Sequence, residues 1–426
     1  MFRHHALIEH LSSNLHDFLN QISRNLSKPN KKFLRDGIIA LIRAGRPIVC
    51  RMARQLPNKR PKYLTRVKRL DEHLVAASDF DERIKRALPK LWLPFIKDDT
   101  PIILDLSDIA KPLAKKMDYL ATVRDGSTGQ LVNGYWLVEM YASVSRKNPI
   151  PILLEPFSHE QPQCAGQNPV VLDAVHRIFK LTGKRGVIVA DRGFDGRIMF
   201  DDWLDNKYRF VVRLRGDRHL LAFCGNSDDF SASEVSLSNR VATGGRWVLT
   251  EERLLAERIP TPHRWAKLIR RHGKPDLRLM QVGWVKVRLP GRAENLTMVV
   301  SRLAGRLAPL MLLTNLPVEN LRDAQRVLRY YARRWECEEG IRFLKSQVNL
   351  EKIRTFRWAA ICRLVLLAVL VMIYLGWIVE EHPNLCDRLI RLGEPLPDEV
   401  EFLLYRLLTG VTEAINACFY LRRDLL

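Results

Sequence analysis

The chain has 426 residues, enough to bury a sizeable core and to form about two to four domains. Its 69 basic and 47 acidic residues give a formal net charge of +22, which favours a polyanionic partner, either nucleic acid or an anionic membrane surface. Seven scattered cysteines without a Cys-x-x-Cys pair argue against a zinc site and indicate free thiols in a reducing cytoplasm. The N-terminus lacks the apolar core of a signal peptide.

Residues 1–98 have the pattern of a helical domain. Apolar residues recur at helical spacing in Asn14–Leu26 and Lys32–Arg43, and Pro29 and Pro47 are expected to break the chain between helices.

A strongly basic segment, Arg51–Leu70, lies within this region and contains no acidic residue. Such a segment is either a solubilising linker or a DNA contact, and the missing acidic residues favour DNA. The candidate DNA-binding side chains are Arg51, Arg54, Lys59, Arg60, Lys62, Arg66, Lys68 and Arg69.

Residues 99–215 alternate between strand and helix patterns, which predicts an α/β fold with a mixed sheet covered by helices. The first strand begins at Pro101 and is expected to end on Asp105, and the strand in Gly186–Gly196 ends on Asp191. Further strands are predicted at Gly134–Ser145, Pro149–Phe157 and Tyr208–Leu214, and helices at Val170–Leu181 and Ile198–Asn206.

Residues 216–305 interrupt this rhythm and predict a β-rich insertion, with strands in Leu277–Leu289 and Asn295–Val300. Its basic, aromatic-bearing edge includes Arg264, Trp265, Arg270 and Arg271 as candidate DNA contacts. Residues 306–380 return to the core through a strand at Leu310–Thr314 and a helix capped by Asn320. Residues 381–426 form a helical C-terminal region, a candidate for dimerisation.

The stretch Ala359–Val379 contains a single charge and is long enough to span a bilayer. A helix buried in a large α/β core has the same composition. Because the rest of the chain is not membrane-like, we expect burial in protein and no membrane partner.

The stretch Tyr330–Lys345 contains good helix formers and no proline. On one continuous helix, Tyr331, Arg334, Glu338 and Lys345 would share a stripe roughly 60° wide. Such a face is either a solvated surface with i, i+4 ion pairs or a site for metal and phosphate.

Asp105 and Asp191 at strand ends, with Glu338 on the helix, could hold a metal at the sheet edge, although a strand-end aspartate also commonly closes a turn. Asp108 and Asp195 are near alternatives. Carboxylate ligands favour Mg²⁺ or Mn²⁺ over zinc, and two such ions about 4 Å apart can activate a nucleophile and stabilise the leaving oxygen of a phosphodiester.

The spacing Tyr-x2-Arg-x3-Glu-x6-Lys resembles the signature of cut-and-paste insertion-sequence transposases, and Asp105-x-Ser and Ala-Asp191-Arg-Gly-Phe resemble the contexts of that family's two catalytic aspartates. The resemblance covers roughly residues 99–350. It implies an RNase H-like core. It also implies that the catalytic and metal-binding residues are Asp105, Asp191 and Glu338, and that the residues contacting DNA phosphates near the cut are Tyr331, Arg334 and Lys345.

The resemblance further implies a bacterial enzyme that cleaves DNA at terminal inverted repeats with two metal ions and joins the 3′ ends to target DNA. A homodimer in the end complex and a cytoplasmic, nucleoid-associated location are expected. The alternatives are a structure-specific nuclease of the same fold, a catalytically decayed DNA-binding protein and a basic membrane-associated protein.

Overall fold

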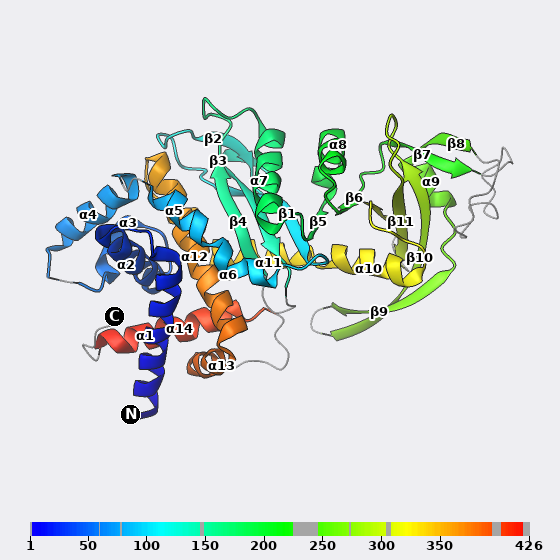
Figure 1. Cartoon of the computed structure of the whole chain (residues 1–426). Coiled ribbons are helices and arrows are strands. Elements are labelled where there is room, and N and C mark those ends of the chain that lie inside the picture. Colours follow the sequence, from blue (N-terminus) through cyan, green and yellow to red (C-terminus); the bar gives the residue numbers. More distant parts are fainter. Residues whose placement is uncertain are drawn as a thin grey trace. The chain divides into compact units, whose positions relative to one another are not determined.

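The computed structural model describes residues 2–58, 60–76, 79–144, 149–224, 246–271, 274–303, 308–393 and 402–420 (Figure 1). The chain divides into two compact units. The first contains residues 1–100, 105–185 and 335–426, and the second contains residues 101–104 and 186–334. Strand β1 (Pro101–Ala110) therefore contributes to both units.

The first unit is mainly helical. Its helices before the sheet are α1 (Phe2–Ser23), α2 (Lys28–Ala44), α3 (Val49–Gln55), α4 (Tyr63–Ala76), α5 (Phe80–Ala87), α6 (Pro89–Trp92) and η1 (Leu93–Phe95). Helix α7 (Gln167–Thr182) follows the strands. The later helices are α11 (Trp335–Ser346), η3 (Leu350–Lys352), α12 (Trp358–Glu381), α13 (Pro383–Leu392) and α14 (Leu404–Tyr420). Figure 1 shows α1 beside α14, which packs against it.

Local signals set several of these boundaries. Ser27 caps α2 by accepting a hydrogen bond from the backbone N–H of Asn30, and Gly45 ends the helix with φ 60°. The expectation that Pro29 separates helices is wrong. Pro29 lies in the first turn of α2, where a missing N–H costs no intrahelical bond.

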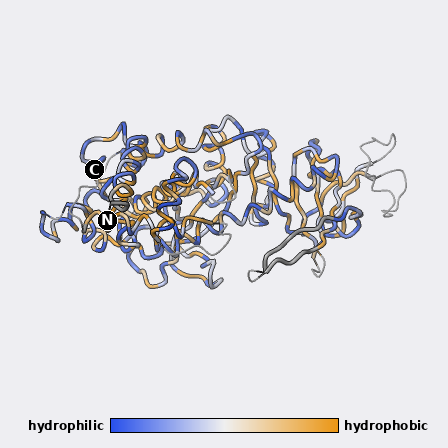
Figure 2. Tube along the Cα trace, turned by 90° about the horizontal axis from the view of Figure 1, so that it is seen from below, coloured by the Kyte–Doolittle hydropathy of each residue, from blue (hydrophilic) through white to orange (hydrophobic). Residues whose placement is uncertain are grey.

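The strands of the first unit follow the order β2–β3–β1, with β4 also paired to β3. Strands β2 (Ala121–Arg124) and β4 (Ile150–Phe157) are both antiparallel to β3 (Leu131–Ala142). Figure 2 colours the trace by hydropathy, and hydrophobic and hydrophilic stretches alternate along most of it.

Helix α12 is the apolar segment of the sequence. It is long and apolar enough to cross a membrane, but 89% of its most hydrophobic 18-residue window is buried in the protein. It packs against β4, α2 and α4 and against the C-terminal helices. Burial within the first unit therefore accounts for its composition.

The second unit joins a parallel sheet to an antiparallel one. Residues 101–104 of β1 pair in parallel with β5 (Val187–Ala190), which pairs in parallel with β6 (Phe210–Arg213). The order continues antiparallel through β12 (Leu310–Thr314), β11 (Leu296–Leu303), β10 (Lys274–Arg288), β7 (His219–Cys224) and β8 (Arg246–Glu251), and β9 (His263–Arg271) pairs with β10. The helices of this unit are η2 (Arg192–Phe194), α8 (Arg197–Asp205), α9 (Glu252–Arg258) and α10 (Leu321–Ala332).

The predicted fold class is confirmed: a mixed α/β fold with a β-rich insertion and helical N- and C-terminal regions. Strands β1, β5 and β6 are parallel and β3 and β4 are antiparallel, which is consistent with the predicted RNase H-like core. The finer division at residues 98, 215, 305 and 380 stays a prediction.

Candidate active site

Asp105 lies in the middle of β1 and not at its end, because the strand continues to Ala110. The expectation of a strand-end position is therefore wrong for this residue. Its carboxylate is half-buried, and Oδ1 accepts a hydrogen bond from the Leu106 N–H at 2.8 Å. Oδ2 lies 3.2 Å from Cys337 Sγ. Cys337 lies in the first turn of α11 and directly precedes Glu338, so the contact places Asp105 beside this turn.

The stretch Tyr330–Lys345 is not one helix. Helix α10 ends at Ala332, Arg333 and Arg334 form a turn, and α11 begins at Trp335. The predicted single stripe is therefore wrong, because its four residues lie on two helices and the turn between them. The Arg334 guanidinium lies 5.9 Å from the centre of the Tyr331 ring, and both residues are buried.

Glu338 is half-buried in the first turn of α11, where a carboxylate is favoured by the unsatisfied N–H groups of the helix. Its two acidic neighbours are engaged elsewhere. Ser143 Oγ donates to Glu336 Oε2, and Glu339 pairs with Arg342 on the same helix. Glu338, the glutamate that the sequence analysis selected, takes part in neither of these two pairings.

Lys345, at the end of α11, contacts two carboxylates. Its Nζ lies 2.9 Å from Asp108 Oδ1 and 3.2 Å from Glu351 Oε1. Burial disfavours the charged ammonium, but Asp108 and Glu351 outweigh it and raise the pKa of Lys345. The predicted phosphate contact stays a prediction, and a phosphate would have to compete with these carboxylates.

Glu139 on β3 is a carboxyl near Asp105 that the sequence analysis missed. It is 1% exposed, and burial together with the charge of Asp105 raises its pKa well above the usual range. A neutral carboxylic acid at this position adds no negative charge beside Asp105. The strand pattern around it is largely apolar, so its burial could have been expected, but its neighbour could not.

Asp191 in the second unit directly follows β5, which confirms its predicted strand-end position. It caps the short helix η2: Oδ1 accepts a hydrogen bond from the Gly193 N–H at 2.7 Å. A Cβ at Gly193 would stand 2.8 Å from the same oxygen, so a larger residue there would displace the Asp191 side chain. Asp191 is half-buried. Since Asp105 and Glu338 belong to the first unit, the three-carboxylate site stays a prediction.

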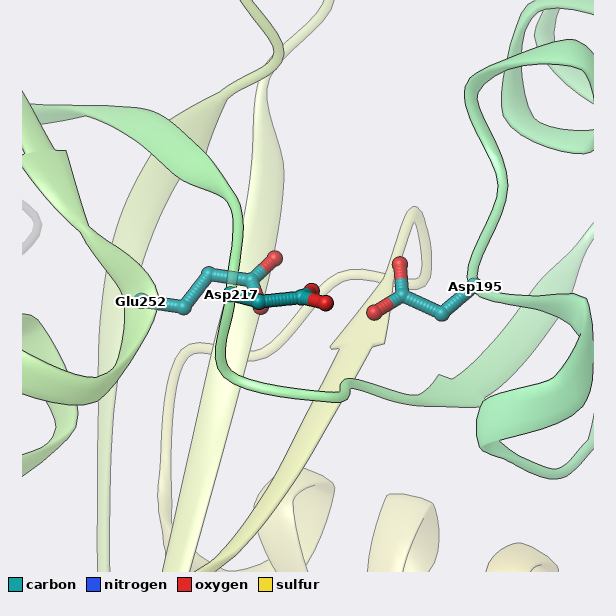
Figure 3. A group of neighbouring side chains, drawn as sticks. All are labelled: Asp195, Asp217 and Glu252. Carbon is teal, nitrogen blue, oxygen red and sulfur yellow. The ribbon is translucent and has the colours of Figure 1, made fainter.

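A second acidic group lies within the second unit (Figure 3). Asp195 follows η2, Asp217 lies between β6 and β7, and Glu252 begins α9; one carboxylate oxygen of each lies within 4.8 Å of the others. The Arg218 guanidinium contacts this group: Nη2 lies 2.7 Å from Asp195 Oδ1, and Nε lies 3.8 Å from Glu252 Oε1.

Backbone N–H groups complete the surroundings of this acidic group. Arg215 N donates to Asp195 Oδ2 at 2.7 Å, and Gly216 N donates to Glu252 Oε2 at 3.1 Å. Burial, reinforced by the charge of Asp195, raises the pKa of Glu252 to about 7, and burial also raises the pKa of Asp195. The oxygens suit a divalent cation, but Arg218 already supplies a positive charge here.

The basic segment forms parts of α3 and α4. Tyr63 anchors it, because its hydroxyl donates to Cys50 O at 3.2 Å and the guanidinium of Arg54 lies 5.3 Å from its ring centre. Arg66 is half-buried, and Lys59 lies outside the described residues. The exposed candidate contacts are Arg51, Arg54, Arg60, Lys62, Lys68 and Arg69.

At the basic edge of the insertion, Arg264 is exposed on β9. The side chains of Trp265, Arg270 and Arg271 lie outside the described part of the chain, so their contacts with DNA stay a prediction.

Comparisons with known proteins give two findings. A family model described as the transposase DDE domain matches residues 162–374, which is half of the chain. A solved piggyBac transposase, determined as a synaptic complex with hairpin DNA, is similar over 97% of this chain and 81% of that one, with 13% identity and a TM-score of 0.44. No curated protein matches the sequence.

Proposed function

The chain belongs to the transposase DDE domain family, and from that premise we propose that it cuts DNA at the terminal inverted repeats of an insertion sequence and joins the 3′ ends to target DNA. The observation that carries the proposal is the position of Asp191, a half-buried carboxylate directly after a buried parallel strand and inside the matched region. Glu338 lies in the same matched region, whereas Asp105 precedes it.

We propose Asp105, Asp191 and Glu338 as the catalytic carboxylates. All three residues are half-buried, and carboxylate oxygens are ligands that fit Mg²⁺ or Mn²⁺. When bound, two such ions would activate the attacking hydroxyl or water and stabilise the leaving oxygen. Asp195, Asp217 and Glu252 are the less suitable set, because Arg218 contacts them and the pKa of Glu252 is raised to about 7.

The other residues of the site have positioning roles in this proposal. The Asp105–Cys337 contact holds β1 against the first turn of α11, and the Lys345–Asp108 pair fixes the end of the same helix. Both contacts lie in the first unit and hold the helix that carries Glu338. Arg334 and the exposed cations of α3 and α4 are proposed to bind DNA phosphates in a homodimeric end complex.

The test uses the purified full-length protein and a labelled duplex that carries the DNA flanking its own gene. With Mg²⁺, we expect nicks at the boundary of a terminal repeat and covalent joining of the new 3′ end to a second DNA. Cutting without joining would favour a structure-specific nuclease. Binding without cutting in either Mg²⁺ or Mn²⁺ would favour a decayed DNA-binding protein.

A further inference from the structure

A basic groove on the first unit carries exposed apolar side chains that the proposed function does not use. It has a volume of about 710 Å³ and is formed by residues 110–117, from the end of β1 onward, by residues 351–356, which begin in η3, and by Asp125. Leu113 is 92% exposed and Phe356 is 66% exposed. Two large apolar groups held in water at one groove indicate a binding surface.

Hydrogen bonds fix both walls of the groove. Lys111 Nζ donates to the carbonyl oxygens of Glu351 and Ile353, which ties the two segments together. The Asp118 N–H donates to Phe356 O at 2.8 Å, and the Trp358 N–H donates to Asp118 Oδ2 at 3.1 Å. The backbone at Phe356 is thus held on both sides while its ring remains exposed.

The second wall alternates between buried and exposed residues. Ile353 and Thr355 are buried, whereas Lys352, Arg354 and Phe356 are exposed. Lys352 ends the short helix η3, and Arg354 and Phe356 follow it in irregular backbone. Two cations and an aromatic ring of this wall are therefore exposed within five residues of the chain.

Basic side chains outnumber acidic ones in the lining of the groove. Its basic lining residues are Lys111, Lys115, Lys116, Lys352 and Arg354, and its acidic ones are Asp125 and Glu351. Both acidic groups are engaged: Asp125 accepts from Ser127 and Thr128, and Glu351 pairs with Lys345. Among the residues that the structure describes, the exposed Lys115, Lys116, Lys352 and Arg354 have no hydrogen bond or ion pair from their side chains.

We propose that this groove binds a single-stranded DNA end, with an unpaired base stacked on Phe356 and Leu113 and its phosphates on Lys115, Lys116, Lys352 and Arg354. A duplex would offer phosphates to the cations but no exposed base face to the ring, whereas an unpaired strand offers both. The inference rests on the proposed function, since strand cleavage is the step that creates free ends.

The experiment measures binding of full-length protein to a short fluorescent single strand and to a duplex of the same sequence, in EDTA so that no cleavage occurs. Phe356→Ala is expected to weaken single-strand binding by about five- to hundredfold, while duplex binding changes by less than about twofold. Phe356→Tyr, which keeps an aromatic ring, is expected to retain single-strand binding. Leu131→Ala removes another exposed leucine, 68% exposed and outside the groove, and serves as the matched control.

A second variant tests the cations. Lys352→Gln with Arg354→Gln should flatten the slope of log K against log salt for the single strand by about 1.4, and Lys90→Gln with Lys180→Gln should leave it unchanged. Equal losses on single strand and duplex, or a Phe356→Ala effect no larger than that of Leu131→Ala, would overturn the proposal. The binding experiment measures no cleavage, so a failed single-strand prediction would not contradict the proposed cleavage activity. A protein that fails to cleave DNA could still be tested for single-strand binding.

Discussion

At the scale of single residues, the pairing of Arg218 with two buried carboxyls distinguishes the acidic group of Asp195, Asp217 and Glu252 from the proposed catalytic carboxylates. Asp195 and Glu252 are 4% and 0% exposed, and Arg218 contacts both. Removing water from a carboxylate disfavours its charged form, and one guanidinium only partly offsets this for two acids. The raised pKa of Glu252 therefore has a consequence for stability.

Glu252 is expected to make the protein less stable as the pH rises. Its pKa is 4.5 in the unfolded chain and about 7 in the folded one, so the folded state binds the extra proton between these values. Stability contributed by the neutral acid is present below about pH 4.5 and is lost as the pH rises to about 7, by on the order of 3 kcal/mol. Glu252→Gln, which mimics the neutral form, should gain stability relative to wild type over this range.

The measurement is the difference in unfolding free energy between Glu252→Gln and wild type at pH 5 and pH 8. A difference that does not change with pH would show that Glu252 is ionised at both values. Glu257→Gln, on the exposed side of the same helix, is the control and should show no such trend.

Individual residues also show where prediction from sequence stops. The position of Asp191 could be predicted, because a run of buried apolar residues ends directly before it. The grouping of Asp195 with Asp217 and Glu252 could not, since β7 and β8 separate the last two in the chain and only tertiary packing brings them together. The proximity of Glu139 to Asp105 could not be predicted either, for the same reason.

At the scale of elements, local chemistry predicts helix starts better than helix breaks. Asn320 was expected to cap α10, and it accepts a hydrogen bond from the Asp323 N–H. The helix break at Arg333 and Arg334 contains no glycine or proline, so the sequence did not predict it. Strand β1 runs past Asp105 because its later residues are also partly or fully buried, which the mixed sequence after Asp105 did not indicate.

The cap at Asn320 can be tested directly. Asn320→Ala should destabilise the protein by about 1 kcal/mol, because the N–H of Asp323 loses its acceptor. Asn320→Asp keeps an acceptor and adds a favourable charge at the helix start, so it should be close to neutral. Thermal unfolding of the three proteins checks this, and equal losses for both substitutions would contradict the capping role.

The packing of α11 on β3 gives a second test at this scale. A Cβ at Gly340 would lie 2.8 Å from Cε1 of Tyr141, a fully buried residue. Gly340→Ala is therefore expected to destabilise by about 1–3 kcal/mol, although alanine is the better helix former. Adding Tyr141→Leu should recover part of the loss in a double-mutant cycle. A stabilising Gly340→Ala would show that the helix does not rest on this ring.

At the scale of the whole molecule, the excess of positive charge predicts a polyanionic partner. Neutralising Arg51, Arg60, Lys62 and Arg69, all exposed, should flatten the slope of log K against log salt for duplex DNA by about 3.6. Filter binding across a salt series measures this slope. An unchanged slope would assign the basic segment Arg51–Leu70 to a solvated surface that does not touch DNA.

The central claim is that Asp105, Asp191 and Glu338 perform DNA cleavage, and the rate of end cleavage in Mg²⁺ tests it most directly. Asp105→Asn, Asp191→Asn and Glu338→Gln should each slow cleavage by about a thousandfold or more, equivalent to about 4 kcal/mol of barrier, with affinity for end DNA within about twofold of wild type. Glu252→Gln should cleave at close to the wild-type rate. Loss of cleavage in Glu252→Gln, with cleavage retained in the other three variants, would contradict the account.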